Sequence, residues 1–210
     1  MRRLLVTCFG PFPSMPRNPS AAAARAVAAS PRWRLHGVKT QALILTTAYG
    51  TLAREFDPPL AARPDAVLMI GVAGRSKQVR VEWRATNRRS TLFPDVAGER
   101  AEMPVAGRSR PVRRTPLPPR KMLLCLRRHG LPSRLSRDAG RYLCNAAYYR
   151  ALGTGLPVLF IHIPKSPDPN RPGRRAGHWP QRLAAALAEI GLELLREGRR
   201  PRVERARGLL

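Results

Sequence analysis

The clearest shortage in this sequence is of acidic side chains. Its 210 residues include only 13 Asp and Glu against 39 Lys and Arg, which gives a formal net charge of +26. Lysine is scarce as well, because only 4 of the basic residues are Lys and the other 35 are Arg. An excess of positive charge on this scale favours weak, salt-sensitive adhesion to nucleic acid.

The arrangement of the arginines argues against a dedicated polyanion site. They are spread along the whole chain, with denser stretches at residues 108–120 and 194–207. No basic run is interleaved with aromatic residues, and no zinc-finger or RNP-like motif is present. A general bias toward arginine at solvated positions accounts for this spread. We expect any nucleic-acid binding to be non-specific, and keep a basic nucleic-acid-binding protein as an alternative function.

Cysteine and long apolar runs are also scarce. Cys8, Cys125 and Cys144 are odd in number and widely spaced, which fits neither a disulfide framework nor a zinc knuckle. Such usage indicates a reducing compartment. No stretch approaches the ~20 apolar residues of a membrane span, and the apolar run near the N-terminus is too short for a signal peptide. We therefore expect a cytoplasmic protein with no membrane partner.

Short apolar runs alternate with helical patterns along the chain. The expected strands span residues 4–7, 38–45, 66–72, 78–83 and 158–163. The expected helices span residues 18–29, 49–60, 120–128, 139–152 and 179–197. Residues 87–119, which are rich in Arg, Pro and Gly, predict a long excursion that contains at most a short hairpin.

This alternation predicts an α/β fold in which a twisted, mixed but mostly parallel sheet lies between two layers of helices. The length suits one domain. We expect that domain to cover residues 1–197, with residues 198–210 forming a basic, frayed tail.

Three residues with catalytic potential lie at the ends of these elements. Ligands of α/β sheets bind beyond the carboxyl ends of strands, where the pattern places Glu82 and His162. Cys144 lies near the start of a helix, whose dipole favours a thiolate. Singly, each has an ordinary structural explanation, but together they are the set that thiol nucleophilic catalysis requires. Cys125, inside an apolar run, is interpreted as a buried structural residue.

Four segments resemble, in order and spacing, the pyroglutamyl (pyrrolidone-carboxylate) peptidase family of cysteine peptidases. They are T-C-F-G-P-F at 7–12 with N-P-S at 18–20, G-V-A-G at 71–74 with Val81, Glu82 and Asn87, D-A-G-R-Y-L-C-N at 138–145 with Tyr149, and F-I-H-I-P at 160–164. The resemblance implies a hydrolase-like three-layer α/β/α fold. It also implies removal of an N-terminal pyroglutamyl residue from peptides, with no metal or organic cofactor.

The resemblance implies roles for particular residues. Cys144 stands at the position of the nucleophile, His162 at that of its base, and Glu82 at that of the third triad member. Backbone amides would form the oxyanion hole. Family members often form homotetramers, so a homo-oligomer is expected here.

The resemblance also indicates a substrate pocket. Phe9 and Phe12 match the aromatic residues that enclose the flat lactam ring, and an apolar slot suits such an uncharged, compact group. Asn18 matches the Asn that supports their loop.

Several positions depart from the family pattern. Family glycines are replaced by Cys8, Pro13, Ser14 and Arg75. Leu92 stands where many members carry an Arg near the oxyanion site, which leaves Arg88 or Arg89 as candidates to replace it. These departures keep a further hypothesis open, namely a divergent member that has another acyl or amide substrate or has lost activity.

Overall fold

The computed structural model describes residues 1–12, 15–92, 94–100, 105–107, 109–165 and 178–199. Pro13, Ser14 and residues 200–210 of the expected tail lie outside the described residues. The strands are β1 (Arg2–Phe9), β2 (Val38–Leu45), β3 (Ala66–Ala73), β4 (Val79–Glu82), β5 (Arg84–Thr86), β6 (Val112–Arg114), β7 (Ser133–Ser136) and β8 (Val158–Pro164). The helices are α1 (Pro19–Ala28), α2 (Arg32–Leu35), α3 (Leu52–Glu55), α4 (Asp57–Ala61), α5 (Pro119–Arg128), α6 (Leu143–Leu152) and α7 (Trp179–Glu197).

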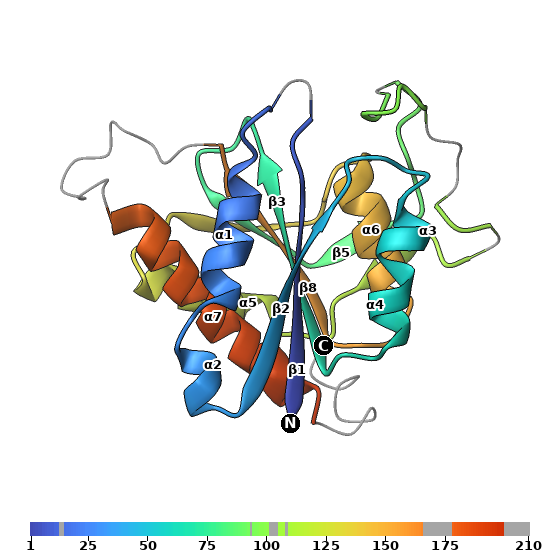
Figure 1. The fold of residues 1–210 in the computed structure, drawn as a ribbon. Helices are drawn as coiled ribbons and strands as arrows, with labels where there is room; N and C mark the ends of the chain where they lie inside the picture. The colour runs from blue at the N-terminus through green and yellow to red at the C-terminus, as the bar shows by residue number, and fades with distance from the viewer. Residues whose placement is uncertain (13–14, 93, 101–104, 108, 166–177, 200–210) are drawn as a thin grey trace.

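A six-stranded sheet forms the middle of the molecule, in the order β2-β1-β3-β8-β4-β7 (Figure 1). β1 pairs in parallel with β2 and β3, and β3 pairs in parallel with β8. β4 is reversed, because it runs antiparallel to β8 and parallel to β7. β5 and β6 form a separate antiparallel pair at either end of the 87–111 excursion. The sheet is thus mixed and mostly parallel, as predicted.

Helices cover both faces of this sheet. α1, α2, α5 and α7 lie on one side, and α3, α4 and α6 on the other (Figure 1). Successive strand side chains point to opposite faces, so Leu68 and Ile70 of β3 pack in the α7 layer while Val67 and Met69 pack in the α6 layer. A sheet covered on both faces explains why its inner strands are continuously apolar. The three-layer α/β architecture is confirmed.

The prediction of one helix over residues 49–60 is wrong, because the segment forms α3 and α4. Pro58 and Pro59 lie in the first turn of α4, where a backbone N–H has no intrahelical acceptor and its loss costs little. The two prolines therefore begin a helix instead of ending one.

The helix that carries Cys144 begins at Leu143, four residues later than predicted. Gly140 adopts a positive φ of 83°, a conformation that favours glycine. Its N–H donates to Asp138 Oδ1 at 2.9 Å, which makes residues 138–140 a turn. The later start makes Cys144 the second residue of the helix, where the prediction made it the sixth.

Candidate active site

The alternation of side chains along the strands decides which residues face α6. In β8 the buried Phe160 packs in the α6 layer, so His162, two residues further on, points the same way. In β4, Val81 belongs to the opposite core, and Glu82 therefore faces α6. Cys144 is the second residue of α6 itself. The fold thus brings the three predicted catalytic residues to one side of the sheet.

Glu82 and His162 are in direct contact inside the protein. His162 Nδ1 lies 2.9 Å from Glu82 Oε1, and Glu82 is fully buried. With Nδ1 donating to the carboxylate, Nε2 is the ring nitrogen left to interact with the Cys144 thiol. Burial by itself would lower the pKa of His162, but hydrogen bonds and charge interactions with Cys144 and Glu82 outweigh it and raise that pKa to about 9. The imidazolium form is therefore favoured beside the sulfur at neutral pH.

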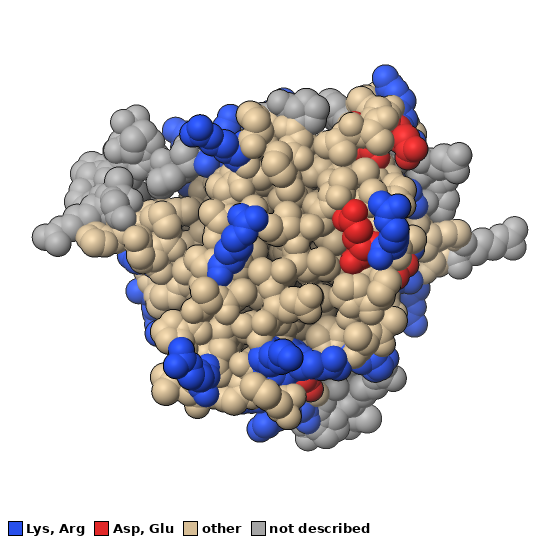
Figure 2. Space-filling view, viewed as in Figure 1, with Lys and Arg blue, Asp and Glu red and all other residues tan. Residues whose placement is uncertain are grey.

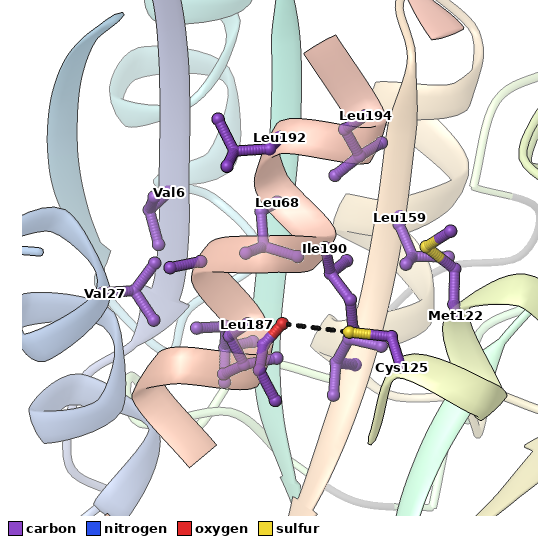
Figure 3. Close-up of a cluster of buried hydrophobic side chains, with 14 of the residues drawn as sticks. Val6, Val27, Leu68, Met122, Cys125, Leu159, Leu187, Ile190, Leu192 and Leu194 are labelled. Atoms are coloured by element: carbon purple, nitrogen blue, oxygen red, sulfur yellow. Dashed lines mark hydrogen bonds between the residues drawn. The ribbon is translucent and has the colours of Figure 1, made fainter. Parts of the chain in front are cut away.

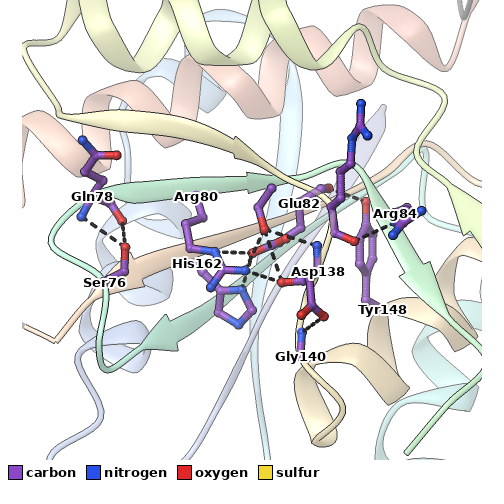
Figure 4. Close-up of polar contacts among 11 residues, drawn as sticks. Ser76, Gln78, Arg80, Glu82, Arg84, Asp138, Gly140, Tyr148 and His162 are labelled. Atoms are coloured by element: carbon purple, nitrogen blue, oxygen red, sulfur yellow. Dashed lines mark hydrogen bonds and ion pairs between the residues drawn. The ribbon is translucent and has the colours of Figure 1, made fainter.

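Arg80 is a second partner of the same carboxylate. Figure 4 shows Arg80 and His162 converging on Glu82. Arg80 Nε lies 2.9 Å from Glu82 Oε1, in an orientation that pairs the charges without an aligned hydrogen bond. Its Nη2 donates to Ser136 Oγ at 2.6 Å and to the carbonyl of Asp138. A buried carboxylate needs such compensation, because desolvation of an unpaired charge is costly.

The reversed direction of β4 explains how deeply Glu82 lies. The sequence predicted that Glu82 lies at the carboxyl end of its strand, level with the carboxyl ends of the other strands. Because β4 runs antiparallel to β8, its carboxyl end lies opposite Phe160, two residues before His162. Arg80, and not Glu82, is the register partner of His162. The carboxylate therefore supports the imidazole from inside the sheet and does not face the cavity.

The start of α6 presents unpaired backbone amides next to the thiol. Tyr142, the N-cap residue, provides no side-chain hydrogen bond to this helix, and the first intrahelical bond of this turn runs from the Ala146 amide to the Tyr142 carbonyl. The N–H groups of Leu143, Cys144 and Asn145 thus lack helical acceptors. Amides and dipole at this helix end favour negative charge on the sulfur or on an oxygen beside it.

Gly71 of β3 allows α6, the helix that carries Cys144, to approach the sheet. A Cβ atom at this position would lie 3.1 Å from Cys144 Sγ and 2.7 Å from Cζ of Phe160. Contacts that short require a neighbour to move, so a residue without Cβ is needed where the thiol meets the strand.

A cavity of about 170 Å³ opens beside Cys144 and His162. Its remaining lining residues are Phe9, Phe12, Asn18, Thr47, Gly71, Val72, Ala139, Tyr142 and Leu143. The three residues predicted to bind substrate thus line the same cavity as the predicted nucleophile and base. Among the described residues, this lining includes no Asp, Glu, Lys or Arg, so the cavity suits a small, uncharged group.

Asn18 joins the cavity loop to α1. Its Oδ1 accepts the N–H of Ser20 at 3.0 Å and caps the helix. Its Nδ2 donates to the Gly10 carbonyl at 2.9 Å, and Thr47 Oγ1 donates to the same carbonyl at 3.2 Å. These bonds fix the backbone between Phe9 and Phe12, the two phenylalanines of the lining.

Comparison with known proteins identifies the relatives of this chain. The model of the pyroglutamyl peptidase family matches residues 2–179. The pyrrolidone-carboxylate peptidase of Chromobacterium violaceum is 32% identical over 201 residues, covering 93% of this chain and 94% of that protein. The chain belongs to the pyroglutamyl peptidase family. It is accordingly a cysteine-type peptidase.

Solved structures of pyrrolidone carboxyl peptidases share the fold. The Thermus thermophilus structure superposes with a TM-score of 0.71 at 30% identity, over 89% of this chain and 98% of that one. The Thermococcus litoralis structure gives a TM-score of 0.80 at 25% identity, over 95% and 97% of the two chains. In the described ranges no helix combines the length and apolarity needed to cross a bilayer.

The position at which this family member lacks an Arg lies away from the cavity. Leu92 is 71% exposed, and Arg88 is exposed as well. Arg89 points inward: its guanidinium lies 5.6 Å from the ring centre of Tyr49 and donates to the Val105 carbonyl at 2.8 Å. Tyr49 in turn packs edge-on against Tyr142 of the cavity lining, with ring centres 5.7 Å apart, so Arg89 is connected to the site through Tyr49.

Sequence reasoning missed Arg80, Thr47 and Tyr142 at this family site. Arg80 carried a signal, because side chains two residues apart on a strand share a face and Arg80 precedes Glu82 by two. Tyr142 also carried a signal, because it precedes Cys144 by two residues within the 138–145 segment. Thr47 carried none, because tertiary packing alone brings it to the cavity.

Proposed function

We propose that this chain removes the N-terminal pyroglutamyl residue from peptides, with Cys144 as nucleophile, His162 as acid and base, and Glu82 as the residue that orients His162. The observation that carries the proposal is the cavity lining beside Cys144 and His162. It is small and apolar, and no carboxylate is present in the described lining to bind an α-ammonium group. A neutral lactam fits this environment better than a free amino terminus does.

The proposed reaction has two steps. The Cys144 thiolate attacks the pyroglutamyl carbonyl, and the protonated His162 then donates its proton to the departing amine, which leaves a thioester on Cys144. Water, deprotonated by His162, hydrolyses the thioester and releases pyroglutamate. The amides of Leu143 and Cys144 would bind the oxyanion of each tetrahedral intermediate, each contributing ~3 kcal/mol. Phe9 and Phe12 would hold the lactam ring, and Asn18 would keep their loop in place.

The test is hydrolysis of a fluorogenic pyroglutamyl amide. Cys144→Ala should abolish turnover, and iodoacetamide should alkylate Cys144 of the wild type with loss of activity in proportion. Cys8→Ser is the matched control, because Cys8 is a buried thiol whose side chain packs in the α7 layer, on the far side of the sheet. Full activity of the alanine variant would refute the assignment of the nucleophile.

A substrate panel tests the specificity separately. Amides of pyroglutamate, alanine, proline and acetyl-alanine present a lactam, a free amine, a cyclic amine and an open-chain acyl group. We expect cleavage of the first. Hydrolysis confined to another member, or of none, would instead favour the divergent relative considered from the sequence.

Three coarser properties complete the proposal. We place the catalytic domain at residues 1–197, supported by the family match over residues 2–179. Limited proteolysis should therefore leave residues 1–197 intact. We propose a cytoplasmic location, supported by three cysteines without disulfides and testable by cell fractionation. We propose a homotetramer on the family resemblance alone, to be tested by light scattering of the eluting peak from size-exclusion chromatography.

A further inference from the structure

A second group of reactive side chains lies in the opposite helical layer, far from the cavity. Cys125 of α5, His129 at the end of α5 and Glu189 of α7 each offer one donor atom, and these atoms lie within 4.8 Å of one another. Cys125 and His129 are four residues apart and so share one face of their helix. Glu189 approaches that face from α7. A sulfur, an imidazole nitrogen and a carboxylate oxygen are thus brought together by two helices.

We propose that Cys125, His129 and Glu189 form a binding site for one zinc ion. Zn²⁺ is bound by these three donor types, and three protein ligands with a water molecule complete a tetrahedron. Zinc–ligand bonds of about 2.0–2.3 Å place neighbouring donors roughly 3.4–3.6 Å apart. The longest distance between two of the three donor atoms is at most 4.8 Å. It must shorten by about 1 Å for both atoms to bind one ion, and rotation of the side chains can provide that change.

The three residues differ in burial, because Cys125 lies inside the protein while His129 and Glu189 are partly exposed to solvent. Cys125 is 2% exposed, and Figure 3 shows its sulfur turned toward α7, where it contacts the Ala186 carbonyl at 3.6 Å. The His129 and Glu189 side chains are 21% and 27% exposed. An ion can therefore enter past the histidine and carboxylate and reach the thiol behind them.

The existing contacts leave the donors available for a metal. His129 Nε2 lies 2.9 Å from Glu189 Oε2, while Arg128 pairs with the other oxygen, Oε1. A zinc ion between His129 and Oε2 would replace the first contact, and ionisation of Cys125 would remove the hydrogen bond that its thiol donates to the Ala186 carbonyl. Arg128 would remain as an outer-shell partner that orients the carboxylate, as metal sites commonly require.

The charges of the three ligands suit a divalent ion. Zn²⁺ displaces the proton of a cysteine thiol on binding, and the thiolate of Cys125 and the carboxylate of Glu189 then balance the two charges of the ion. The net charge of +26 repels cations at long range, and Figure 2 shows Lys and Arg scattered over one face of the molecule with few Asp and Glu between them. Binding therefore depends on these ligands and not on the surface potential.

Zinc titration of the Cys144→Ala protein tests the proposal, because that background removes the other cysteine–histidine pair. We expect one zinc per chain and a rise in Tm, since a ligand that binds the folded state stabilises it. Both should be lost in Cys125→Ser and retained in Cys8→Ser, a matched change at another buried thiol. Absence of stoichiometric zinc in the parent, or its loss in the Cys8→Ser control, would overturn the assignment.

A milder variant and a second metal guard against loss of folding. His129→Gln alters a partly exposed side chain and should keep its circular dichroism spectrum. Its zinc affinity should fall at least about 100-fold, because loss of an outer-shell partner alone costs 10–100-fold. Co²⁺ added to the Cys144→Ala protein should give thiolate-to-cobalt charge-transfer absorption that Cys125→Ser lacks. Unchanged affinity in His129→Gln, or a cobalt spectrum without thiolate absorption, would refute the site.

Discussion

Replacing Gly71 by Ala should damage both the stability and the activity of this enzyme. The added Cβ would lie 2.7 Å from Phe160 Cζ and 3.1 Å from Cys144 Sγ. An ordinary contact of 3.4 Å requires the ring to move by roughly 0.7 Å, because atoms closer than contact distance repel steeply. Phe160 is fully buried, so overpacking should cost about 1–3 kcal/mol. For a chain of this size, each kcal/mol lowers Tm by roughly 2–4 °C.

The displacement of the Phe160 ring should also lower the rate of catalysis. The Phe160 ring centre lies 4.6 Å from that of His162 and 5.6 Å from that of Tyr148, so displacement of the ring should disturb the imidazole of His162, the proposed catalytic base. A misplacement approaching 1 Å costs on the order of 100-fold in rate. We therefore expect kcat for a pyroglutamyl amide to fall by about 10–100-fold, with a smaller change in KM.

Gly74→Ala provides the matched control, because a Cβ there meets open space and the glycine has no positive φ. Both variants should be compared by thermal denaturation and by kcat. The double variant Gly71→Ala, Phe160→Leu should recover part of the lost activity, since the smaller side chain relieves the contact. Wild-type Tm and kcat in Gly71→Ala would show that the close approach of Gly71 to Phe160 and Cys144 is not required.

Three further predictions concern charge and capping. In Glu82→Gln the pKa of His162 should drop below the wild-type value of about 9, so the alkaline limb of the kcat/KM profile should move to lower pH. The raised pKa of His162 in the folded state provides a stabilisation that is complete below pH 6.5 and is lost as pH rises through about 9. The unfolding free energy of the wild type should therefore fall between these pH values more than that of Glu82→Gln does. Equal alkaline limbs, or an equal pH dependence of the unfolding free energy, would contradict this. Asn18→Asp keeps the acceptor that caps α1 but loses the donor to the Gly10 carbonyl, so it should raise KM at near-wild-type Tm. Asn18→Ala loses the cap as well and should also lose about 1 kcal/mol of stability. Equal Tm values for the two variants would show that the cap does not contribute to stability. DNA retained at 50 mM salt should be released by 200 mM salt whatever its sequence, and sequence-selective binding that survives 200 mM salt would contradict non-specific adhesion.

The parts of the fold that the sequence predicted best are those with strong local patterns. The bounds of α7 and β2 agree with the prediction residue for residue, because a long amphipathic helix and a bounded apolar strand each repeat one signal. The start of α6 was missed, because the Asp138–Gly140 turn lies inside an otherwise helical pattern. β7 was missed because it is short and three of its four residues are polar, a composition that loops share, and its one apolar residue, Leu135, is exposed.

The site was predictable in its residues but not in its geometry. Glu82, Cys144 and His162 could be selected because the family resemblance marks each of them. The direction of β4 could not be predicted, because the direction of a strand in a sheet is decided by partners that are distant in sequence. The closeness of Cys125 to Glu189 was equally hidden, because α5 and α7 are brought together only by the sheet on which both pack.

The reversed strand β4 also affects the order in which the enzyme becomes competent. Its sheet neighbours, β7 and β8, both follow it in the chain, and the Glu82–His162 contact spans 80 residues. At translation rates of about 5–20 residues per second, His162 is synthesised roughly 4–16 s after Glu82. β7, which precedes β8 in the chain, can pair with β4 during that interval, but contacts of such long sequence separation are slow to form even in the complete chain. With the proposed triad, the peptidase stays inactive until β8 has paired with β4 and brought His162 to Glu82.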